Sequence, residues 1–362
     1  MPRFTFVPLL AAAAIVTAAQ SPSSIPTPTL TPQKSGTTQL LIAVYPVNTQ
    51  VVWASGTGGT YVVTTDGGAH WKSAVVPGAE NLQFRDVYGV SDTEAYLLSI
   101  GNFENNFRIY KTIDGGATWT IEFQNERLNA FYDCFGFWTP DRGIAHTDSV
   151  NGVFYDYRTT NGATWESISK FMPPALPGEA SFAASGTCVA TEGTENAWVA
   201  TGGSTIARIL ATKDGGNSWN AYDTPLVSSP SAGAISVAFR DASHGMVGGG
   251  DLSCNELADT ATSDDGGQTW NLTTKPPVKG SVFCLAYACP KESTQFAQYE
   301  RVVVITTETV PNYTAGDAAW TPDEGHTWYT LSGVSGYWAV GFANPTAGWF
   351  VGNNGQILKI SF

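Results

Sequence analysis

The sequence predicts an all-β fold, a seven-bladed β-propeller of four-stranded antiparallel blades, and three observations support this. A short motif recurs six times at intervals near 50 residues, each interval holds segments typical of strands, and the chain ends in a further, incomplete unit. The composition agrees, since 12% of the 362 residues are aromatic and 38 are glycine, whereas only 14% are charged. Short strands joined by glycine turns have such a composition, and disordered chains have few aromatic residues and a high net charge.

The recurring motif is Asp-Gly-Gly, two further residues and a tryptophan. The spacings between successive motif tryptophans are 48, 46, 54, 51 and 58 residues, and these tryptophans are Trp71, Trp119, Trp165, Trp219, Trp270 and Trp328. Self-similarity at a fixed period of this size is the signature of a repeat architecture. We therefore predict one structural unit of about 50 residues, repeated around an axis.

Each unit has the same internal order. An apolar strand such as LIAVYPV or FRDVYGV comes first, and a strand with small residues such as VVWASG follows. A third strand such as YVVTTDGG leads into the motif, and the tryptophan opens a fourth. Alternating apolar residues with turn signals every 8–12 residues are typical of an all-β protein.

The last unit lacks its fourth strand. The segments GYWAVGFAN, GWFVGNNG and QILKISF match strands one to three. We expect a segment before residue 40 to supply the missing outer strand and close the ring, because radial repetition protects sheet edges only when the ring closes. A two-sheet sandwich is the alternative, but it does not require a period near 50.

The N-terminal region predicts export. Residues 1–20 combine Arg3 with the apolar run FTFVPLLAAAAIVTAA, which indicates a cleaved secretory signal peptide. A membrane anchor is the alternative, but the run is short for a span and no later segment approaches the length needed. Residues 21–38 are rich in Ser, Thr and Pro and are interpreted as a linker, part of which can become an edge strand. Residues 39–362 form one propeller domain.

Several features bear on partners and location. The sequons at Asn271 and Asn312 fit an N-glycosylated protein that is secreted and extracellular. A net charge of −13 argues against nucleic acid and anionic membranes as partners. We expect a monomer that binds a glycan or an extracellular protein.

The five cysteines are Cys134, Cys188, Cys254, Cys284 and Cys289. An exported protein can form disulfides, and an odd number leaves at least one cysteine free or paired between chains. The connectivity stays open. No Cys/His spacing resembles a zinc site, and no nucleotide-binding glycine loop or redox motif is present, so we predict neither a metal nor a cofactor.

The motif itself is interpreted as structural. Asp-Gly-Gly is a hairpin turn signal, and the tryptophan supplies a large apolar face for packing between sheets. Six copies spread around a ring cannot all face one substrate.

The pattern S/T-x-D-x-G-x-T-W resembles the Asp-box, or BNR, repeat. The copies read TTDGGAHW, TIDGGATW, TTNGATW, TKDGGNSW, SDDGGQTW and TPDEGHTW, and the third is one residue short, with Asn161 in place of Asp. The resemblance covers nearly the whole chain after residue 38 and implies the propeller fold. Propellers with this repeat include sialidases, xyloglucan hydrolases, sortilin-type receptors and photosystem II assembly-factor propellers. The chain is most similar to the last group and its secreted microbial relatives.

The predicted meander defines two faces. The motifs lie between strands three and four, on the face that also carries the turns between strands one and two. The opposite face, here called the long-loop face, carries the longer segments 99–108, 146–157, 248–259 and 306–317 and the longest connection, 169–182. Binding residues concentrate in long loops on rigid scaffolds, so we expect the site there.

Three arginines are candidates for binding an anionic group. Arg85 lies on an inner strand, and Arg108 and Arg208 each precede a motif aspartate by six residues. Guanidinium groups pair bidentately with carboxylates, although separate surface salt bridges would give the same pattern. Acidic residues in the long loops are further binding candidates, or else solvated loop residues: Asp148, Asp251 and Glu256.

Five residues are candidates for catalysis if the chain is an enzyme. Tyr132 with Glu179 would be nucleophile and base, and Asp86 or Asp133 an acid. His146 would be a general base. The alternatives are a salt-bridged ring lining the channel and a hydrogen-bonded loop histidine.

Two functions follow. The first is a secreted, non-catalytic binding or scaffold propeller that holds a glycan or protein on its long-loop face. The second is a carbohydrate-active enzyme, sialidase-like or a uronic-acid lyase, that holds an acidic sugar with the three arginines. The sialidase resemblance is faint, since FRDV at 84–87 only partly matches the Phe-Arg-Ile-Pro motif of that family and sialidases typically have six blades.

Overall fold

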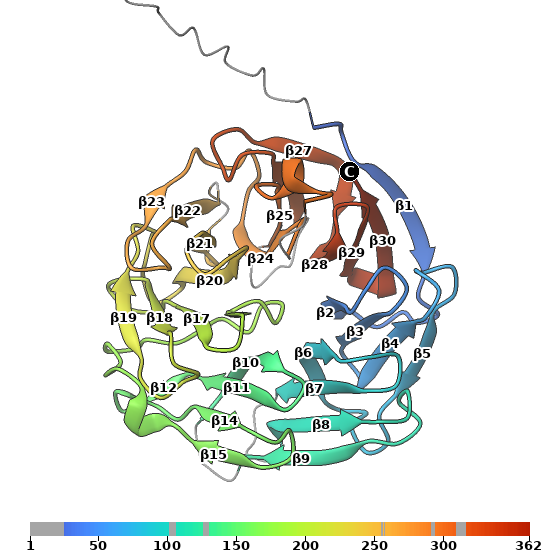
Figure 1. Ribbon diagram of the computed structural model, residues 1–362, viewed down its shortest axis with the longest axis horizontal. Helices are drawn as coiled ribbons and strands as arrows, with labels where there is room; N and C mark the ends of the chain where they lie inside the picture. The colour runs from blue at the N-terminus through green and yellow to red at the C-terminus, as the bar shows by residue number, and fades with distance from the viewer. Residues whose placement is uncertain are drawn as a thin grey trace, which may run out of the picture.

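The computed structural model describes residues 25–100, 106–125, 130–254, 256, 258–290, 294–308 and 316–362. These residues form seven four-stranded antiparallel sheets arranged as blades around a central axis, which confirms the predicted propeller (Figure 1). A two-stranded hairpin of β12 (Ser149–Val150) and β13 (Val153–Phe154) is inserted in blade 3. In the described part of the chain, no helix is long and apolar enough to cross a membrane.

In blades 1 to 6 the four strands follow one another in sequence order from the axis outward. Blade 1 is β2 (Leu41–Pro46), β3 (Val52–Gly56), β4 (Thr60–Thr64) and β5 (Lys72–Val75); blade 2 is β6 (Gln83–Gly89), β7 (Ala95–Ile100), β8 (Arg108–Thr112) and β9 (Thr120–Gln124). Blade 3 is β10 (Tyr132–Thr139), β11 (Arg142–Thr147), β14 (Tyr157–Thr159) and β15 (Trp165–Ser167); blade 4 is β16 (Val189–Glu192), β17 (Asn196–Thr201), β18 (Arg208–Thr212) and β19 (Asn220–Asp223).

The remaining blades complete the ring. Blade 5 is β20 (Ala232–Phe239), β21 (Gly245–Asp251), β22 (Asp259–Ser263) and β23 (Asn271–Leu272); blade 6 is β24 (Ser281–Tyr287), β25 (Val303–Glu308), β26 (Asp317–Thr321) and β27 (Tyr329–Ser335). Blade 7 is β28 (Tyr337–Asn344), β29 (Ala347–Gly352), β30 (Gln356–Ser361) and β1 (Thr29–Lys34). Short 3-10 turns are η2 (Ser169–Phe171), η3 (Ala297–Tyr299) and η4 (Asn353–Gly355).

The N-terminal strand closes the ring, as the sequence predicts. β1 pairs antiparallel with β30, with Leu30 opposite Ile360, and so supplies the outer strand that the last unit lacks. Figure 1 shows the blue β1 lying along the outer edge of the red C-terminal blade. With this strand in place, all seven blades have four strands.

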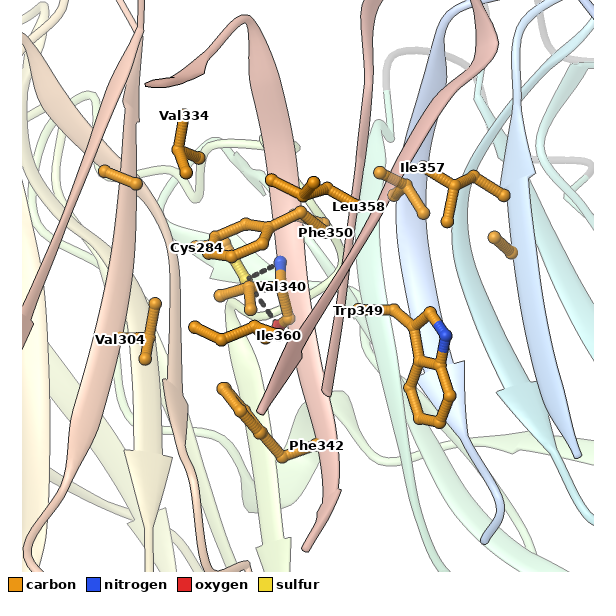
Figure 2. Packing of buried hydrophobic residues seen from close by; sticks show 14 of the residues in the cluster. Cys284, Val304, Val334, Val340, Phe342, Trp349, Phe350, Ile357, Leu358 and Ile360 are labelled. Atoms are coloured by element: carbon orange, nitrogen blue, oxygen red, sulfur yellow. Dashed lines mark hydrogen bonds between the residues drawn. The ribbon is translucent and has the colours of Figure 1, made fainter. Parts of the chain in front are cut away.

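Apolar side chains fill the spaces between blades. Figure 2 shows Cys284 of blade 6 beside Phe350, Leu358 and Ile360 of blade 7. The Cys284 thiol donates to the Val340 carbonyl at 3.2 Å and accepts from the Val340 N–H at 3.3 Å. Burial raises the pKa of this thiol, so Cys284 is a buried core residue that joins two blades.

The motif turns share one hydrogen-bond pattern, shown clearly at Asp265. Its Oδ1 accepts from the Ser263 hydroxyl at 2.8 Å and from the N–H groups of Gln268 and Thr269, each at 2.9 Å. Its Oδ2 accepts from the Thr269 hydroxyl at 2.7 Å. Partial burial opposes ionisation, but these hydrogen bonds outweigh it and lower the pKa of Asp265 to about 2. The aspartate therefore holds the turn, as predicted.

We expect Asp265→Ala to lower the free energy of unfolding by about 1–2 kcal/mol, because the backbone amides of the turn lose their acceptor as at a removed helix cap. Urea unfolding at neutral pH measures this. The adjacent Asp264 is exposed, so Asp264→Ala is the matched control. Equal stabilities of the two variants would contradict a structural role for the motif aspartate.

The motif tryptophans pack against the preceding blade. Trp119 of blade 2 contacts Tyr61 of blade 1, with ring centroids 5.1 Å apart. Trp71 of blade 1 donates from Nε1 to Oε1 of Gln33 in β1, at 3.0 Å. Because β1 belongs to blade 7, this contact continues the same packing across the closure of the ring.

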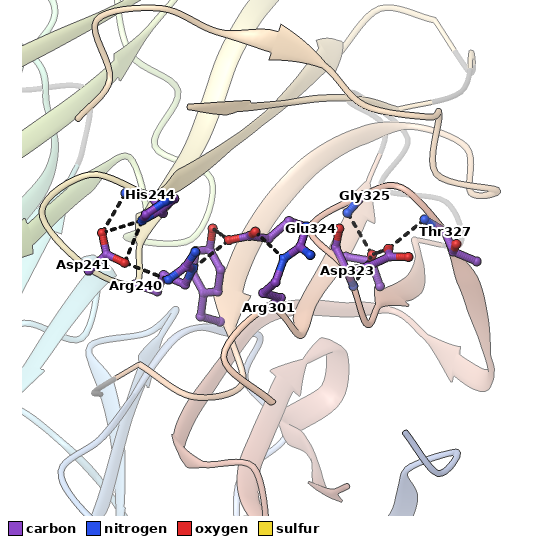
Figure 3. Close-up of polar contacts among 10 residues, drawn as sticks. Arg240, Asp241, His244, Arg301, Asp323, Glu324, Gly325 and Thr327 are labelled. Carbon is purple, nitrogen blue, oxygen red and sulfur yellow. Dashed lines mark hydrogen bonds and ion pairs between the residues drawn. The ribbon is translucent and has the colours of Figure 1, made fainter. Parts of the chain in front are cut away.

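The sixth motif departs from Asp-Gly-Gly at Glu324. This residue has a φ of 54°, in the left-handed region that favours glycine. Figure 3 shows its carboxylate between Arg240 of the blade 5 turn and Arg301 of blade 6, with both Nε–Oε distances at 2.8 Å. Tyr287 also donates to it, at 3.1 Å. These contacts join blades 5 and 6 and offset the backbone strain.

Candidate functional site

The connection between blades 3 and 4 enters the central channel. Residues 180–188, here called the plug, precede the inner strand β16, which has only four residues. Ala184 packs with Ile42 of blade 1, Phe283 of blade 6 and Trp338 of blade 7 in one buried cluster. In Figure 1 a yellow-green loop reaches toward the axis at this place. The plug therefore contacts blades on several sides of the axis.

Polar contacts fix the plug on opposite sides. Arg85 of blade 2 donates to the Ala183 carbonyl at 2.8 Å, and the Thr187 carbonyl accepts from the Val237 N–H of blade 5 at 2.9 Å. Gly186 has a φ of 78°, and a side chain there would collide with the Asp86 carboxylate. A disulfide joins Cys188 at the end of the plug to Cys134 of β10.

The plug separates two cavities in the channel. On the motif side, a cavity of about 350 Å³ is lined by residues of the inner strands and by Ser185, Gly186 and Thr187. On the long-loop side, a second cavity of about 260 Å³, here called the long-loop cavity, is lined by Ser181 to Ala184 and by side chains of blades 2, 3, 5, 6 and 7. The inner-strand acids are thereby divided: Asp86 lines the first cavity and Asp133 the second.

Three predicted site residues meet in the long-loop cavity: Arg85, Asp133 and Asp148. The Arg85 guanidinium lies over the Trp338 ring, 5.4 Å from its centroid. Asp148 accepts from the Ser181 N–H of the plug at 3.0 Å. Asp133 is 1% exposed and receives no hydrogen bond from an N–H group or hydroxyl of the described residues; its protonated form donates to the neighbouring Asp148 carboxylate.

Both carboxyl groups of this pair have a raised pKa. For Asp133, burial is the main cause and the neighbouring Asp148 charge adds to it, while Arg85 opposes it. For Asp148, burial again raises the pKa more than its hydrogen bonds and His146 lower it. Two close acids in a poorly hydrated site hold a proton more firmly than isolated acids.

This raised pKa gives a pH-dependent prediction. Folding favours the protonated form of Asp133, so its contribution to stability is full below the unfolded pKa near 4 and is lost as pH rises through the higher folded pKa. We expect Asp133→Asn to unfold like the wild type at pH 3, and to be more stable by roughly 1–3 kcal/mol at pH 7–8, the usual cost of a buried polar group that is poorly satisfied by donors. Thermal melts across this range measure the difference, and a gap independent of pH would contradict it.

Glu179 and Arg208 form a buried ion pair with each other. Glu179 is 1% exposed, and Arg208 donates to it from Nε at 2.9 Å and also from a terminal nitrogen. Thr201 Oγ1 and the Leu176 N–H donate to the same carboxylate, each at 2.7 Å. The charges of Glu179 and Arg208 thus neutralise each other inside the protein, and their ion pair fixes the long connection to blade 4.

The other catalytic candidates lie in the core. His146 and Tyr132 are both 0% exposed. His146 Nδ1 contacts Asp156 Oδ2 at 2.8 Å, while its Nε2 has no hydrogen-bond partner in the described structure. Tyr132 packs among the rings of Phe107, Phe123 and Tyr157. Neither side chain lines either cavity.

The remaining candidates are dispersed. Arg108 donates to the Tyr110 hydroxyl at 3.0 Å. Asp251 accepts from Ser253 and Ser231, and the hydrogen bonds from Ser253 lead the causes that lower its pKa. Glu256 is exposed.

The predicted glycosylation sites differ in what the structure shows. Asn271 is exposed on β23, and Asn312 lies outside the described residues. Among the residues that the structure describes, no group of three or more His, Cys, Asp or Glu side chains is placed to hold a metal ion.

Sequence reasoning missed the plug and the aromatic wall of the long-loop cavity. The signal was the segment ASFAASGTC, a run of small and apolar residues inside a long connection that ends in a cysteine. Such a run is unusual for a solvated loop. Phe283 and Trp338, which complete the wall, appear in the sequence only as ordinary apolar positions of inner strands.

Comparison with known proteins supports the fold. No family model matches the chain, and no curated protein sequence matches it. Solved structures similar to it include YCF48 bound to D1 peptide and YCF48 from Cyanidioschyzon merolae, each with a TM-score of 0.61 and 16% identity over 92% of this chain and 97% and 98% of theirs. The GH74 xyloglucanase from Xanthomonas campestris has a TM-score of 0.57 and 14% identity over 91% of this chain and 53% of its own. The predicted likeness to photosystem II assembly-factor propellers is thus confirmed at the level of the fold.

Proposed function

We propose that this chain is an exported, non-catalytic propeller that binds a protein or glycan ligand on its long-loop face. The observation that carries the proposal is the plug. It fills the channel between the two cavities, and the candidate base Glu179, which belongs to the long connection, is neutralised by Arg208. A buried carboxylate already engaged by a cation and two further donors is poorly suited to act on a substrate.

The comparisons add support for a binding role. A structure of the same fold is that of YCF48 bound to D1 peptide. The long-loop face of this chain gathers the loops between strands two and three and the connections between blades, which is where propellers and other rigid scaffolds place binding residues. A peptide segment of another protein is therefore the first ligand class to test, with glycans as the second.

Array screening with matched charge reversals tests this proposal. The full chain is applied to peptide and glycan arrays, together with Glu256→Arg on the long-loop face and Asp264→Arg on the motif face, both exposed positions. We expect a ligand whose binding falls at least tenfold with Glu256→Arg and is unchanged with Asp264→Arg. Binding that is lost only with Asp264→Arg, or no binding to either array, would overturn the proposal.

Export has its own test. The protein purified from the medium of an expressing culture is expected to begin near residue 21 and to lose mass on enzymatic deglycosylation. Asn271→Gln removes one expected glycan, because Asn271 is exposed. Retention of residues 1–20 in an intracellular product would contradict this part of the proposal.

The acid pair favours one second candidate, a hydrolase or lyase acting on an acidic sugar. Asp133 and Asp148 share one cavity with Arg85, an arrangement that supplies an acid and a carboxylate-binding cation. Product analysis on the glycan array distinguishes the two functions. Turnover of a glycan that disappears with Arg85→Ala would establish the enzyme and overturn the binding-only proposal.

A further inference from the structure

The long-loop cavity contains one buried carboxyl group whose partner within the described residues is a second acid. Asp133 lies on the inner strand of blade 3 with 1% of its surface exposed; no N–H group or hydroxyl of the described residues donates to its carboxyl oxygens, and its partner is the neighbouring Asp148 carboxyl. An ionised carboxyl group that is buried beside another acid, without an N–H or hydroxyl donor, costs free energy. A ligand that donates hydrogen bonds to Asp133 would remove that cost.

The same cavity holds charges of both signs. Asp148 stands beside Asp133, and the pair forms an acidic end that suits a protonated amine. The Arg85 guanidinium is held in place over Trp338, and it donates to the Ala183 carbonyl of the plug at 2.8 Å and to Gln83 Oε1 at 3.2 Å. Because an arginine is always charged and presents five donors, it also suits a carboxylate.

The rest of the lining is apolar. It consists mainly of Ile100, Phe131, Phe182, Leu252 and Phe283. The volume of about 260 Å³ holds one small molecule. A sugar ring presents hydroxyl groups around its whole edge, and most of this wall offers them no hydrogen-bond partner.

From this arrangement we propose that the long-loop cavity binds a free α-amino acid with an apolar side chain. Its ammonium group pairs with Asp133 and Asp148, its carboxylate with Arg85, and its side chain with the aromatic and aliphatic wall. One zwitterionic molecule thus interacts favourably with the acidic, the cationic and the apolar parts of the cavity. A peptide offers only one of the two charged groups at either end, so the free amino acid is the favoured form.

This inference deepens the proposed function, since it rests on the long-loop face being the binding face. It also has a structural consequence. Four residues of the lining, Ser181 to Ala184, belong to the plug. An amino acid bound there contacts the plug and several blades at once, and would raise the free energy of unfolding of the closed ring with the logarithm of its free concentration once that exceeds Kd.

Isothermal titration calorimetry on the purified full chain tests the proposal with three probes: L-leucine, N-acetyl-L-leucine and isoamylamine. We expect one saturable site for L-leucine and no binding of N-acetyl-L-leucine, which lacks the ammonium group. Isoamylamine, which lacks the carboxylate, is expected to bind at least fivefold more weakly. Equal affinities for isoamylamine and leucine would show that Arg85 does not bind the carboxylate and would contradict the proposed binding mode.

A variant and a matched control complete the test. Asp133→Asn keeps the shape of the side chain and is expected to weaken leucine binding at least tenfold, whereas Asp223→Asn, an exposed change of the same charge on the same face, leaves it unchanged. Thermal melts confirm that both variants fold. Absence of leucine binding, or unchanged binding in Asp133→Asn, would overturn the inference while leaving the array result intact. A failed array screen with leucine binding preserved would overturn only the proposed macromolecular ligand.

Discussion

Glu179→Gln is expected to lower the free energy of unfolding by about 3–5 kcal/mol. The change leaves the guanidinium of Arg208, a residue that is 9% exposed, without its counter-charge. Removal of one partner of a buried ion pair costs this much because the remaining charge stays desolvated. Urea unfolding followed by tryptophan fluorescence measures the loss.

Two further variants isolate the cause. In the double variant Glu179→Leu/Arg208→Met, both charges are gone, and most of the lost stability should return, since apolar replacement of a buried pair is often neutral. Glu166 pairs with Arg158 at 2.8 Å but is 62% exposed, so Glu166→Gln should change stability by less than about 1 kcal/mol. A Glu179→Gln variant as stable as Glu166→Gln would contradict the buried pair as a major contribution.

Cys188→Ser is expected to destabilise the propeller by about 4 kcal/mol. The Cys134–Cys188 disulfide closes a loop with a sequence separation of 54 residues, and the loss of such a constraint raises the entropy of the unfolded chain by this amount. The plug also loses its covalent attachment to blade 3. Urea unfolding under non-reducing conditions measures the change.

Reduction and a second cysteine provide the controls. With dithiothreitol present, the wild type should lose stability until it matches Cys188→Ser, while the variant itself should not respond. Cys254 is only partly buried and outside the disulfide, so Cys254→Ser should behave like the wild type. A wild type that is insensitive to reduction while unfolding would show that this disulfide does not stabilise the ring.

The blade architecture was predictable because its signals are local. In each motif turn the aspartate, or Asn161 in the third copy, accepts hydrogen bonds from backbone N–H groups within about six residues, as Asp265 does. The residues that specify the turn are therefore adjacent in the sequence and recognisable there. The closing strand was predictable from a count of strands, because the last repeat unit has three and a complete blade needs a fourth from another part of the chain. Neither prediction required knowledge of long-range contacts.

The plug was not predictable in this way. Its path depends on contacts between residues about a hundred positions apart, such as Ser185 with the Phe283 carbonyl and Arg85 with the Ala183 carbonyl. The periodic pattern of apolar residues and motifs in the sequence carries no information about such long-range contacts. The grouping of Arg85, Asp133 and Asp148 in one cavity depends on that path, because the plug forms one wall of the cavity.

The partner of Arg208 illustrates the same limit. Arg108 and Arg208 occupy the same position before their motifs, and the sequence alone assigns them the same role. In the structure, Arg208 pairs with Glu179 from the long connection, whereas Arg108 contacts Tyr110 of its own strand. The repeat determines where in the blade an arginine lies. The connection between blades, which differs in length and sequence, determines which residue that arginine contacts.

Closure by β1 and β30 has a consequence for biosynthesis. β1 leaves the ribosome before any other strand of the propeller, yet its hydrogen-bond partner β30 is made last. Until then, β1 has no sheet to join, and the side of blade 1 that faces blade 7 lacks its neighbour. We infer that the ring closes only once β30 has been made, and that until then the chain carries one unpaired strand and one exposed apolar face that favour association with other chains.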